Sequence, residues 1–212
     1  MTATRRRLLG LAAGLVLADA ESSSRAQSPD EGLAARLMDD LMWNRGPIGG
    51  PFALIDHTGQ PRADTDFRGK LLLIYFGYTN CPDICPADLM QIGLAMNGLG
   101  PAGEAVQPLF ITLDPERDTA ARLADYVPLF HPRLIGLTGS TEEIRRAALA
   151  FKVYYAKYPR DTADYVVDHS SFVYLVDGAG KYIGFFPPGT TADRMIEMIT
   201  PHLHARVNEY GR

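Results

Sequence analysis

The chain has 212 residues, of which 46% are hydrophobic and 22% charged, and its formal net charge at pH 7 is −4. This length and composition suit one globular domain with its own hydrophobic core, preceded by an N-terminal extension. The acidic balance excludes a protein that binds nucleic acid or an anionic membrane surface. The two cysteines can form at most one disulfide, which excludes a fold held together by a framework of several disulfides.

The first twenty residues have the pattern of an export signal. Three arginines, Arg5 to Arg7, precede an apolar run that reaches Ala18, and the arginine pair after Thr4 is compatible with the twin-arginine type. The run has about half of the roughly 20 residues that a membrane-spanning helix needs. We therefore expect residues 1–20 to be a cleaved signal for export to the bacterial periplasm, with an uncleaved short anchor in the inner membrane as the alternative.

Residues 21–48 are expected to form a linker followed by a short helix. The beginning of this segment is polar and serine-rich, a composition typical of linkers. Apolar residues then recur at Leu33, Leu37 and Leu41, a spacing that predicts an amphipathic helix over residues 31–43.

The two cysteines lie between an uninterrupted apolar run, which indicates a strand buried on both faces, and a helix. Pro82 and Pro86 each disfavour helical geometry in the residue before them, so Cys81 and Cys85 are expected at turn positions. Proline at the first helical position predicts a helix from residue 86 to about residue 97. The positive end of that helix lowers the pKa of a nearby thiol, and the thiolate is both a nucleophile and a metal ligand.

Three roles remain open for this pair of thiols. A structural disulfide is the usual fate of two cysteines in an exported protein, but a loop this short gains little entropy on closure. A redox-active dithiol is the second possibility. Two soft ligands for Cu(I) or zinc are the third, and thiols at a strand-to-helix turn favour either chemical role over the structural one.

The whole chain alternates strands with helices. This order predicts an α/β fold with a central mixed β-sheet that is flanked by helices. The expected strands are residues 52–55, 71–76, 106–113, 134–137, 153–158, 165–167, 172–176 and 182–186. The later helices are expected to begin at Asp118 or Thr119, at Ser140 and at Thr191, and to end near residues 130, 151 and 202.

An acidic turn follows the strand at residues 106–113, with the sequence Asp114-Pro115-Glu116-Arg117-Asp118-Thr119. It lies at the carboxyl end of a strand, where α/β folds place their sites. The same residues would also serve to make the turn and to cap the next helix. A functional role and a structural role therefore both remain open for it.

His169 is the candidate third group of the site, with Asp168 beside it. It lies just before the strand that begins at residue 172, a position typical of an ordinary loop residue. Two thiolates and an imidazole make a three-coordinate site that can hold Cu(I) and also accept Cu(II), whereas two thiolates alone favour Cu(I). Asp168 would orient the imidazole ring through a hydrogen bond.

Several blocks of the sequence resemble the signature segments of the Sco/SenC family of copper chaperones. These blocks are residues 75–86, 114–119 and 168–170, and the segments 50–56 and 136–139 are similar to the family as well. The resemblance spans residues 49 to 200, and the blocks match in order.

The resemblance implies a thioredoxin-like fold over residues 49–204, with residues 205–212 as a C-terminal tail. It also implies one copper ion per chain, Cu(I) or Cu(II), held by Cys81, Cys85 and His169. The family's usual role is to deliver copper to the binuclear copper centre of cytochrome c oxidase during assembly. The implied partner is the copper-bearing subunit of the oxidase, and other copper chaperones or a thiol reductase are further candidates. Many members keep a membrane-spanning anchor, and the short apolar run leaves a membrane tether open here.

An enzyme is the competing prediction. A thiol-disulfide oxidoreductase would use Cys81 as the attacking thiol and Cys85 as the resolving thiol, and would keep the partner's cysteines reduced. Redox enzymes that resemble this fold have two residues between their cysteines and a proline before a late strand, whereas this chain has three residues between them and His169 before the strand. We therefore expect a metallochaperone first and an oxidoreductase second.

Overall fold

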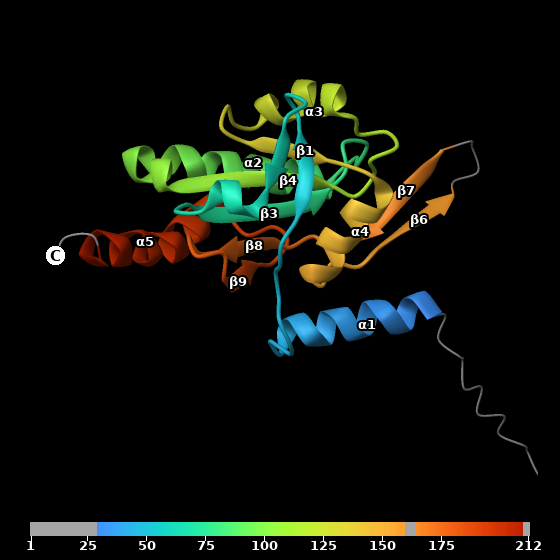
Figure 1. The fold of residues 1–212 in the computed structure, drawn as a ribbon, viewed down its shortest axis with the longest axis horizontal. Helices are drawn as coiled ribbons and strands as arrows, with labels where there is room; N and C mark the ends of the chain where they lie inside the picture. Colours follow the sequence, from blue (N-terminus) through green and yellow to red (C-terminus); the bar gives the residue numbers. More distant parts are fainter. Residues whose placement is uncertain (1–28, 160–163, 210–212) are drawn as a thin grey trace, which may run out of the picture.

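The computed structural model describes residues 29–159 and 164–209 (Figure 1). The predicted export signal lies outside these residues, as does most of the predicted linker. Among the helices in the described ranges, none combines the length and the apolar character that crossing a bilayer requires.

Within the described residues, seven strands form one mixed sheet and two strands form a separate hairpin, β6–β7. The order in the large sheet is β2-β1-β5-β4-β3-β8-β9. β4 runs parallel to both β3 and β5, while the other neighbouring strands are antiparallel. The strands are β1 (Ala53–Asp56), β2 (Pro61–Ala63), β3 (Leu71–Gly77), β4 (Val106–Thr112), β5 (Ile135–Thr138), β6 (Tyr155–Pro159), β7 (Tyr165–His169), β8 (Val173–Val176) and β9 (Tyr182–Phe186).

Helices flank the sheet, as the alternating pattern predicted (Figure 1). α2 and α5 lie side by side, and the side-chain amide oxygen of Gln91 on α2 accepts the N–H of Ala192, the first residue of α5, at 2.9 Å. The α-helices are α1 (Pro29–Met42), α2 (Ile84–Gly98), α3 (Ala120–Tyr126), α4 (Thr141–Ala150) and α5 (Ala192–Glu209), and short 3-10 helices cover Asp64–Phe67, Gly100–Ala105 and Val127–Leu129.

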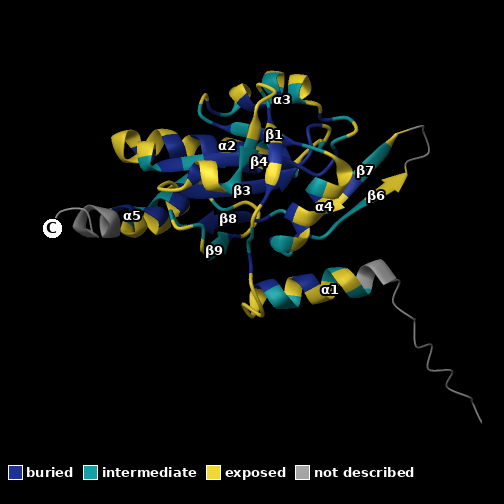
Figure 2. Ribbon diagram, viewed as in Figure 1, coloured by how far each residue is buried: buried dark blue, intermediate teal, exposed yellow. Residues whose placement is uncertain are grey.

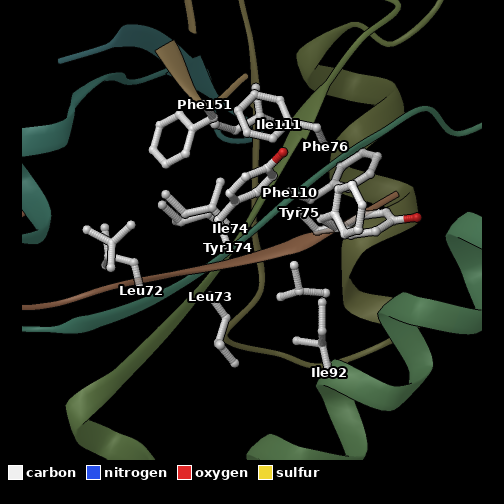
Figure 3. Close-up of a cluster of buried hydrophobic side chains, with 14 of the residues drawn as sticks. Leu72, Leu73, Ile74, Tyr75, Phe76, Ile92, Phe110, Ile111, Phe151 and Tyr174 are labelled. Atoms are coloured by element: carbon white, nitrogen blue, oxygen red, sulfur yellow. The ribbon is translucent and has the colours of Figure 1, made fainter. Parts of the chain in front are cut away.

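The hydrophobic core lies on both faces of β3 (Figures 2 and 3). Every residue of β3 is buried, as its continuous apolar run predicted. Consecutive side chains of a strand point to opposite faces. Tyr75 stacks with Phe110, which contacts Tyr126 of α3, whereas Phe76 contacts Phe151 at the end of α4. β3 is therefore covered by helical layers on both faces, and these contacts fix its carboxyl end within the core.

Local signals in the sequence account for where two helices begin. Ser140 caps α4, because its hydroxyl accepts the N–H of Glu143 at 3.3 Å and the Glu143 carboxylate accepts the N–H of Ser140 at 2.8 Å. Thr119 caps α3 by accepting the N–H of Arg122 at 3.2 Å. Of the two predicted caps of α3, Thr119 has this role and Asp118 does not.

Several predicted boundaries were wrong. α2 begins at Ile84, before Pro86, so Cys85 lies in the first helical turn and not in a turn before the helix. Proline fits there because the first amides of a helix have no intrahelical partner. His169 is the last residue of β7 and not a loop residue, since the hairpin ladder extends to its pairing with Tyr155. α5 continues past residue 202, and β2, only three residues long, was not predicted.

Candidate metal centre

The two cysteines follow the carboxyl end of β3. Cys81 lies half-buried in the loop before α2, and Cys85 lies fully buried in the first turn of α2. Gly77, the last residue of β3, makes room for the second sulfur, because a Cβ at this position would lie 3.0 Å from Sγ of Cys85. The strand and the helix thus place one thiol in the core and the other at its rim.

Cys81 has the character of a thiolate. Its sulfur accepts the backbone N–H of Cys85 at 3.4 Å, and it takes the place of a helix cap because Asp83 makes no side-chain capping bond. Hydrogen bonds from the Cys85 thiol, from His169 and from the amides of Asp83 and Cys85 lower the pKa of Cys81 to about 3, although burial opposes this shift. At neutral pH this sulfur is therefore both a nucleophile and a soft metal ligand.

Cys85 has the opposite character. Its hydrogen bond to Cys81 and its burial both raise the pKa of this thiol. Two adjacent negative sulfurs repel each other, so the pair holds one proton and one charge. A cation that bound both sulfurs would have to displace the proton of Cys85, because the ligand form of cysteine is the thiolate.

His169 faces the cysteines from the end of β7. Its Nε2 lies 3.3 Å from Sγ of Cys85, although 84 positions separate the two residues in the sequence. The rings of Tyr75 and Tyr78 meet the imidazole edge-on, at centroid distances of 6.4 and 6.0 Å. The fold thus brings all three predicted ligands to one place and confines the imidazole between two aromatic rings.

Asp168 does not lie against the imidazole ring. It is exposed, and adjacent residues of a strand point to opposite faces. Instead, Nδ1 of His169 lies 3.2 Å from the carbonyl oxygen of Ser170. The structure therefore does not support the predicted orienting role of Asp168, and a backbone carbonyl takes the place that was predicted for it.

The three candidate ligands are neighbours, but they do not yet converge on one point. In the part of the chain that the structure describes, no group of three or more histidine, cysteine, aspartate or glutamate side chains is arranged to hold a metal ion. Cys85 and His169 contact each other directly. An ion bound between them would replace that contact, while the donor set of two sulfurs and one imidazole suits a soft cation such as Cu(I).

Two further polar groups beside the thiols were not anticipated from the sequence. The Tyr75 hydroxyl and Oδ2 of Asp88 are buried with no hydrogen-bond partner among the described residues, while Oδ1 of Asp88 accepts the N–H of Gly189 at 2.9 Å. Burial raises the pKa of both groups. Asp88 could have been found by its spacing, because it follows Cys85 by three positions and residues so spaced share a helix face.

Comparison with known proteins yields one consistent family. The SCO1/SenC family model matches residues 42–204. The mitochondrial SCO2 homologue of Mus musculus is 46% identical over 159 residues, which cover 74% of this chain and 62% of that protein. The chain therefore spans less than two thirds of the length of this relative.

Solved structures of Sco proteins have the same fold. ScoI of Arabidopsis thaliana, crystallised with copper bound, gives a TM-score of 0.71 at 40% identity, with 74% of this chain and 99% of that chain covered. BsSco, described as a member of the Sco family of cytochrome c oxidase assembly proteins, gives a TM-score of 0.62 at 26% identity, with 74% and 94% covered. The predicted thioredoxin-like fold with a mixed sheet flanked by helices is confirmed.

The same comparisons overturn the predicted location. SCO homologues of mouse, human and Arabidopsis carry the description mitochondrial, which contradicts our prediction of a bacterial periplasmic protein. The prediction rested on the arginines and the short apolar run of residues 1–20, which lie outside the described residues. The family prediction, by contrast, rested on several separate blocks of the domain, and the family model covers more than half of the sequence. The chain belongs to the SCO1/SenC family.

Proposed function

We propose that the chain binds one copper ion, as Cu(I) or Cu(II), through Cys81, Cys85 and His169. The observation that carries this proposal is the 3.3 Å contact between Sγ of Cys85 and Nε2 of His169, beside the thiolate of Cys81. Sco structures that were solved with copper bound support it. We assign the copper-binding unit to residues 49–204, close to the residues that the family model matches.

The same donor set suits a protein that releases its ion. Cu(I) accepts two soft sulfurs, and the imidazole adds a ligand that Cu(II) also accepts. Low coordination and a half-buried Cys81 leave one side of the ion open to a partner's ligands. Binding would consume the thiolate of Cys81 and release the proton of Cys85, so acid should weaken it.

We further propose that the recipient is the binuclear copper centre in the copper-bearing subunit of cytochrome c oxidase. The description of BsSco, a relative at 26% identity, as a member of a family of cytochrome c oxidase assembly proteins supports this choice. Another copper chaperone as donor and a thiol reductase that keeps both cysteines reduced would complete the set of partners.

The first test is copper stoichiometry on the reduced full chain, beside Cys81→Ser and His169→Ala, with Cu(I) and Cu(II) measured separately. We expect one tightly held ion per chain, Cu(II) binding lost in His169→Ala, and both oxidation states lost in Cys81→Ser. Retention of Cu(II) by His169→Ala would remove the imidazole from the proposed ligand set. A chain that binds neither ion would refute the copper proposal.

Reduction of a partner's disulfide is the second candidate, because a half-buried thiolate beside a buried thiol also suits exchange chemistry. Cys81 would attack the disulfide, form a mixed disulfide and release one partner thiolate. Cys85 would then lose its proton, attack Cys81 and release the second thiolate, which leaves a Cys81–Cys85 disulfide that the thiol reductase must reduce. Full disulfide reduction by His169→Ala, with no copper bound by the unmodified chain, would favour this candidate.

A further inference from the structure

The acidic turn after β4 holds two fully buried carboxylates, Asp114 and Asp118. The family resemblance included this turn, but the proposed ligand set does not use it. A buried carboxylate is costly unless several donors compensate for its charge. The donors that compensate for these two charges therefore indicate which parts of the fold the turn connects.

Asp118 binds the thiol loop, residues 78–83, which joins β3 to α2 and carries Cys81. Its Oδ2 accepts the N–H of Thr79 at 2.9 Å and the hydroxyl of Thr112 at 2.7 Å, and its Oδ1 accepts the hydroxyl of Thr79 at 2.6 Å. Thr79 lies two positions before Cys81. Asp118 thus fixes both the backbone and the side chain of Thr79 near the start of the thiol loop.

Asp114 binds the hairpin that carries the imidazole. Its Oδ1 accepts the hydroxyl of Tyr165 at 2.7 Å and lies 3.4 Å from Nζ of Lys157, and its Oδ2 accepts Nε–H of Arg117. Tyr165 is the first residue of β7 and Lys157 lies on β6, while His169 is the last residue of β7. Asp114 therefore contacts β7 at the end opposite the imidazole, and it contacts β6 beside the middle of β7.

Arg117 links the two halves from within the same turn. Its guanidinium lies 3.8 Å from the centre of the Tyr165 ring and 5.9 Å from that of Tyr78, which is a residue of the thiol loop. Its Nη1 also donates to Asp164 at 2.7 Å and to the Tyr165 carbonyl at 3.1 Å. The cation is therefore placed between an aromatic ring of the hairpin and one of the loop.

We propose that this turn is a positioning device for the copper site that sets how closely His169 approaches the two thiols, with Asp118 fixing the thiol loop and Asp114 with Arg117 fixing the hairpin. The inference rests on the proposed function. Because β6 and β7 pair with no strand of the large sheet in the described chain, side-chain contacts fix where the hairpin lies. Val167 packs in the hydrophobic core, and the polar contacts of this turn hold the end of β7 that begins at Tyr165. If the hairpin side is loosened, His169 withdraws, and the two remaining thiols favour Cu(I) over Cu(II).

The test compares Tyr165→Phe with Tyr158→Phe in the full chain. Both variants remove one tyrosine hydroxyl from the same hairpin, but Tyr158 is exposed and its hydroxyl lies 3.2 Å from that of Tyr154 and not against a buried carboxylate. We expect Tyr165→Phe to lower Cu(II) affinity about tenfold, the size of one lost hydrogen bond to a charged group. Cu(I) affinity should stay within about twofold, and the Cu(II) absorption and electron paramagnetic resonance spectra should change.

A readout without copper accompanies these titrations. In the metal-free chain, amide hydrogen exchange of β6 and β7 should be faster in Tyr165→Phe than in Tyr158→Phe, while exchange of β3 stays the same. Thr79→Val tests the other half and keeps the branched shape. It removes the bond that the Thr79 hydroxyl donates to Asp118 and the bond that this hydroxyl accepts from Nε–H of Arg122 at 3.2 Å. We expect it to lower Cu(I) and Cu(II) affinities alike.

The outcomes separate this inference from the proposed function. If Tyr165→Phe matches Tyr158→Phe in Cu(II) affinity, spectrum and exchange while His169→Ala loses Cu(II), the positioning role is refuted and copper binding stands. If Tyr165→Phe lowers Cu(I) and Cu(II) affinities equally, its effect is general destabilisation and the inference also fails. If His169→Ala keeps Cu(II), both the ligand assignment and the positioning inference fail.

Discussion

The thiol pair and the imidazole reach the site from two regions that are built in different ways. The thiols follow β3, in which every residue is buried between helical layers. His169 ends a two-stranded hairpin whose outer strand, β6, is half-buried at Tyr155 and exposed from Lys157 to Pro159. Figure 1 shows this hairpin projecting beyond the edge of the large sheet.

The two halves of the site, the thiol side and the imidazole side, are therefore stabilised by different proportions of apolar packing and polar contacts. Apolar burial holds the thiol side, and its energy is spread over many contacts. On the imidazole side, Val167 packs in the core, and polar contacts to the acidic turn add to this packing. Each of these polar contacts can be removed by a single substitution. We therefore expect that a single substitution loosens the hairpin side with less loss of stability than a truncation in the core around β3.

The largest expected effect would show that the pKa of Cys81 depends more on Cys85, on the core side, than on His169, on the hairpin. Because the pKa of Cys81 is about 3, its alkylation by iodoacetamide should be nearly constant between about pH 4 and pH 8. In Cys85→Ala the main hydrogen bond is lost, so the pKa of Cys81 should rise and the alkylation rate should increase with pH within this range.

His169→Ala is the matched variant from the hairpin side. It removes a smaller contribution than Cys85→Ala, so the pKa of Cys81 should rise, but by less than in Cys85→Ala. Mass spectrometry of the peptide that contains Cys81, in reduced and metal-free protein, measures these rates. Equal shifts of the Cys81 pKa in Cys85→Ala and His169→Ala would contradict the expectation that the core side has the larger influence on this thiol.

The next largest effect is on the free energy of unfolding, when one side chain is truncated on β3 and one on β7. Leu73→Ala on β3 removes a side chain that is 0% exposed, so the free energy of unfolding should fall by about 2–5 kcal/mol. Val166→Ala on β7 removes a half-buried side chain, and the loss should stay below about 1 kcal/mol. Urea unfolding of the metal-free chain measures both, and similar losses would mean that the hairpin is part of the cooperative core.

The smallest expected change in the free energy of unfolding comes from removing an exposed ion pair of the acidic turn. Lys157 lies 2.9 Å from the exposed carboxylate of Glu116 and 3.4 Å from the buried carboxylate of Asp114. Glu116→Gln should change the free energy of unfolding by less than about 0.5 kcal/mol, and high salt should abolish the difference. A loss above about 1 kcal/mol in the same urea assay would show that Glu116 belongs to the positioning device.

Local patterns predicted the elements because local forces determine them. The apolar run of β3 and the capping box at Ser140 each depend on residues close together in the chain. The start of α2 was misplaced because Pro86 suits more than one position in a first turn, and the Cys81 sulfur, not a usual cap, accepts the N–H of Cys85.

The functional contacts were harder to predict because they join distant residues. Asp118 suited the cap of α3 on local grounds, yet its carboxylate binds Thr79, which lies 39 positions away. Asp114 likewise binds Tyr165 across 51 positions. Pairings of this kind depend on the finished topology of the sheet, which no local pattern encodes.

The separation of 84 positions between Cys85 and His169 also has a consequence during translation. At about 5–20 residues per second, the ribosome adds the imidazole roughly 4 to 17 s after the second thiol. During that interval the nascent chain holds two of the three proposed ligands, the two sulfurs, a donor set that favours Cu(I) and is open to oxidation. On the proposed ligand set, affinity for Cu(II) would therefore be acquired late in synthesis, when β7 is completed and pairs with β6.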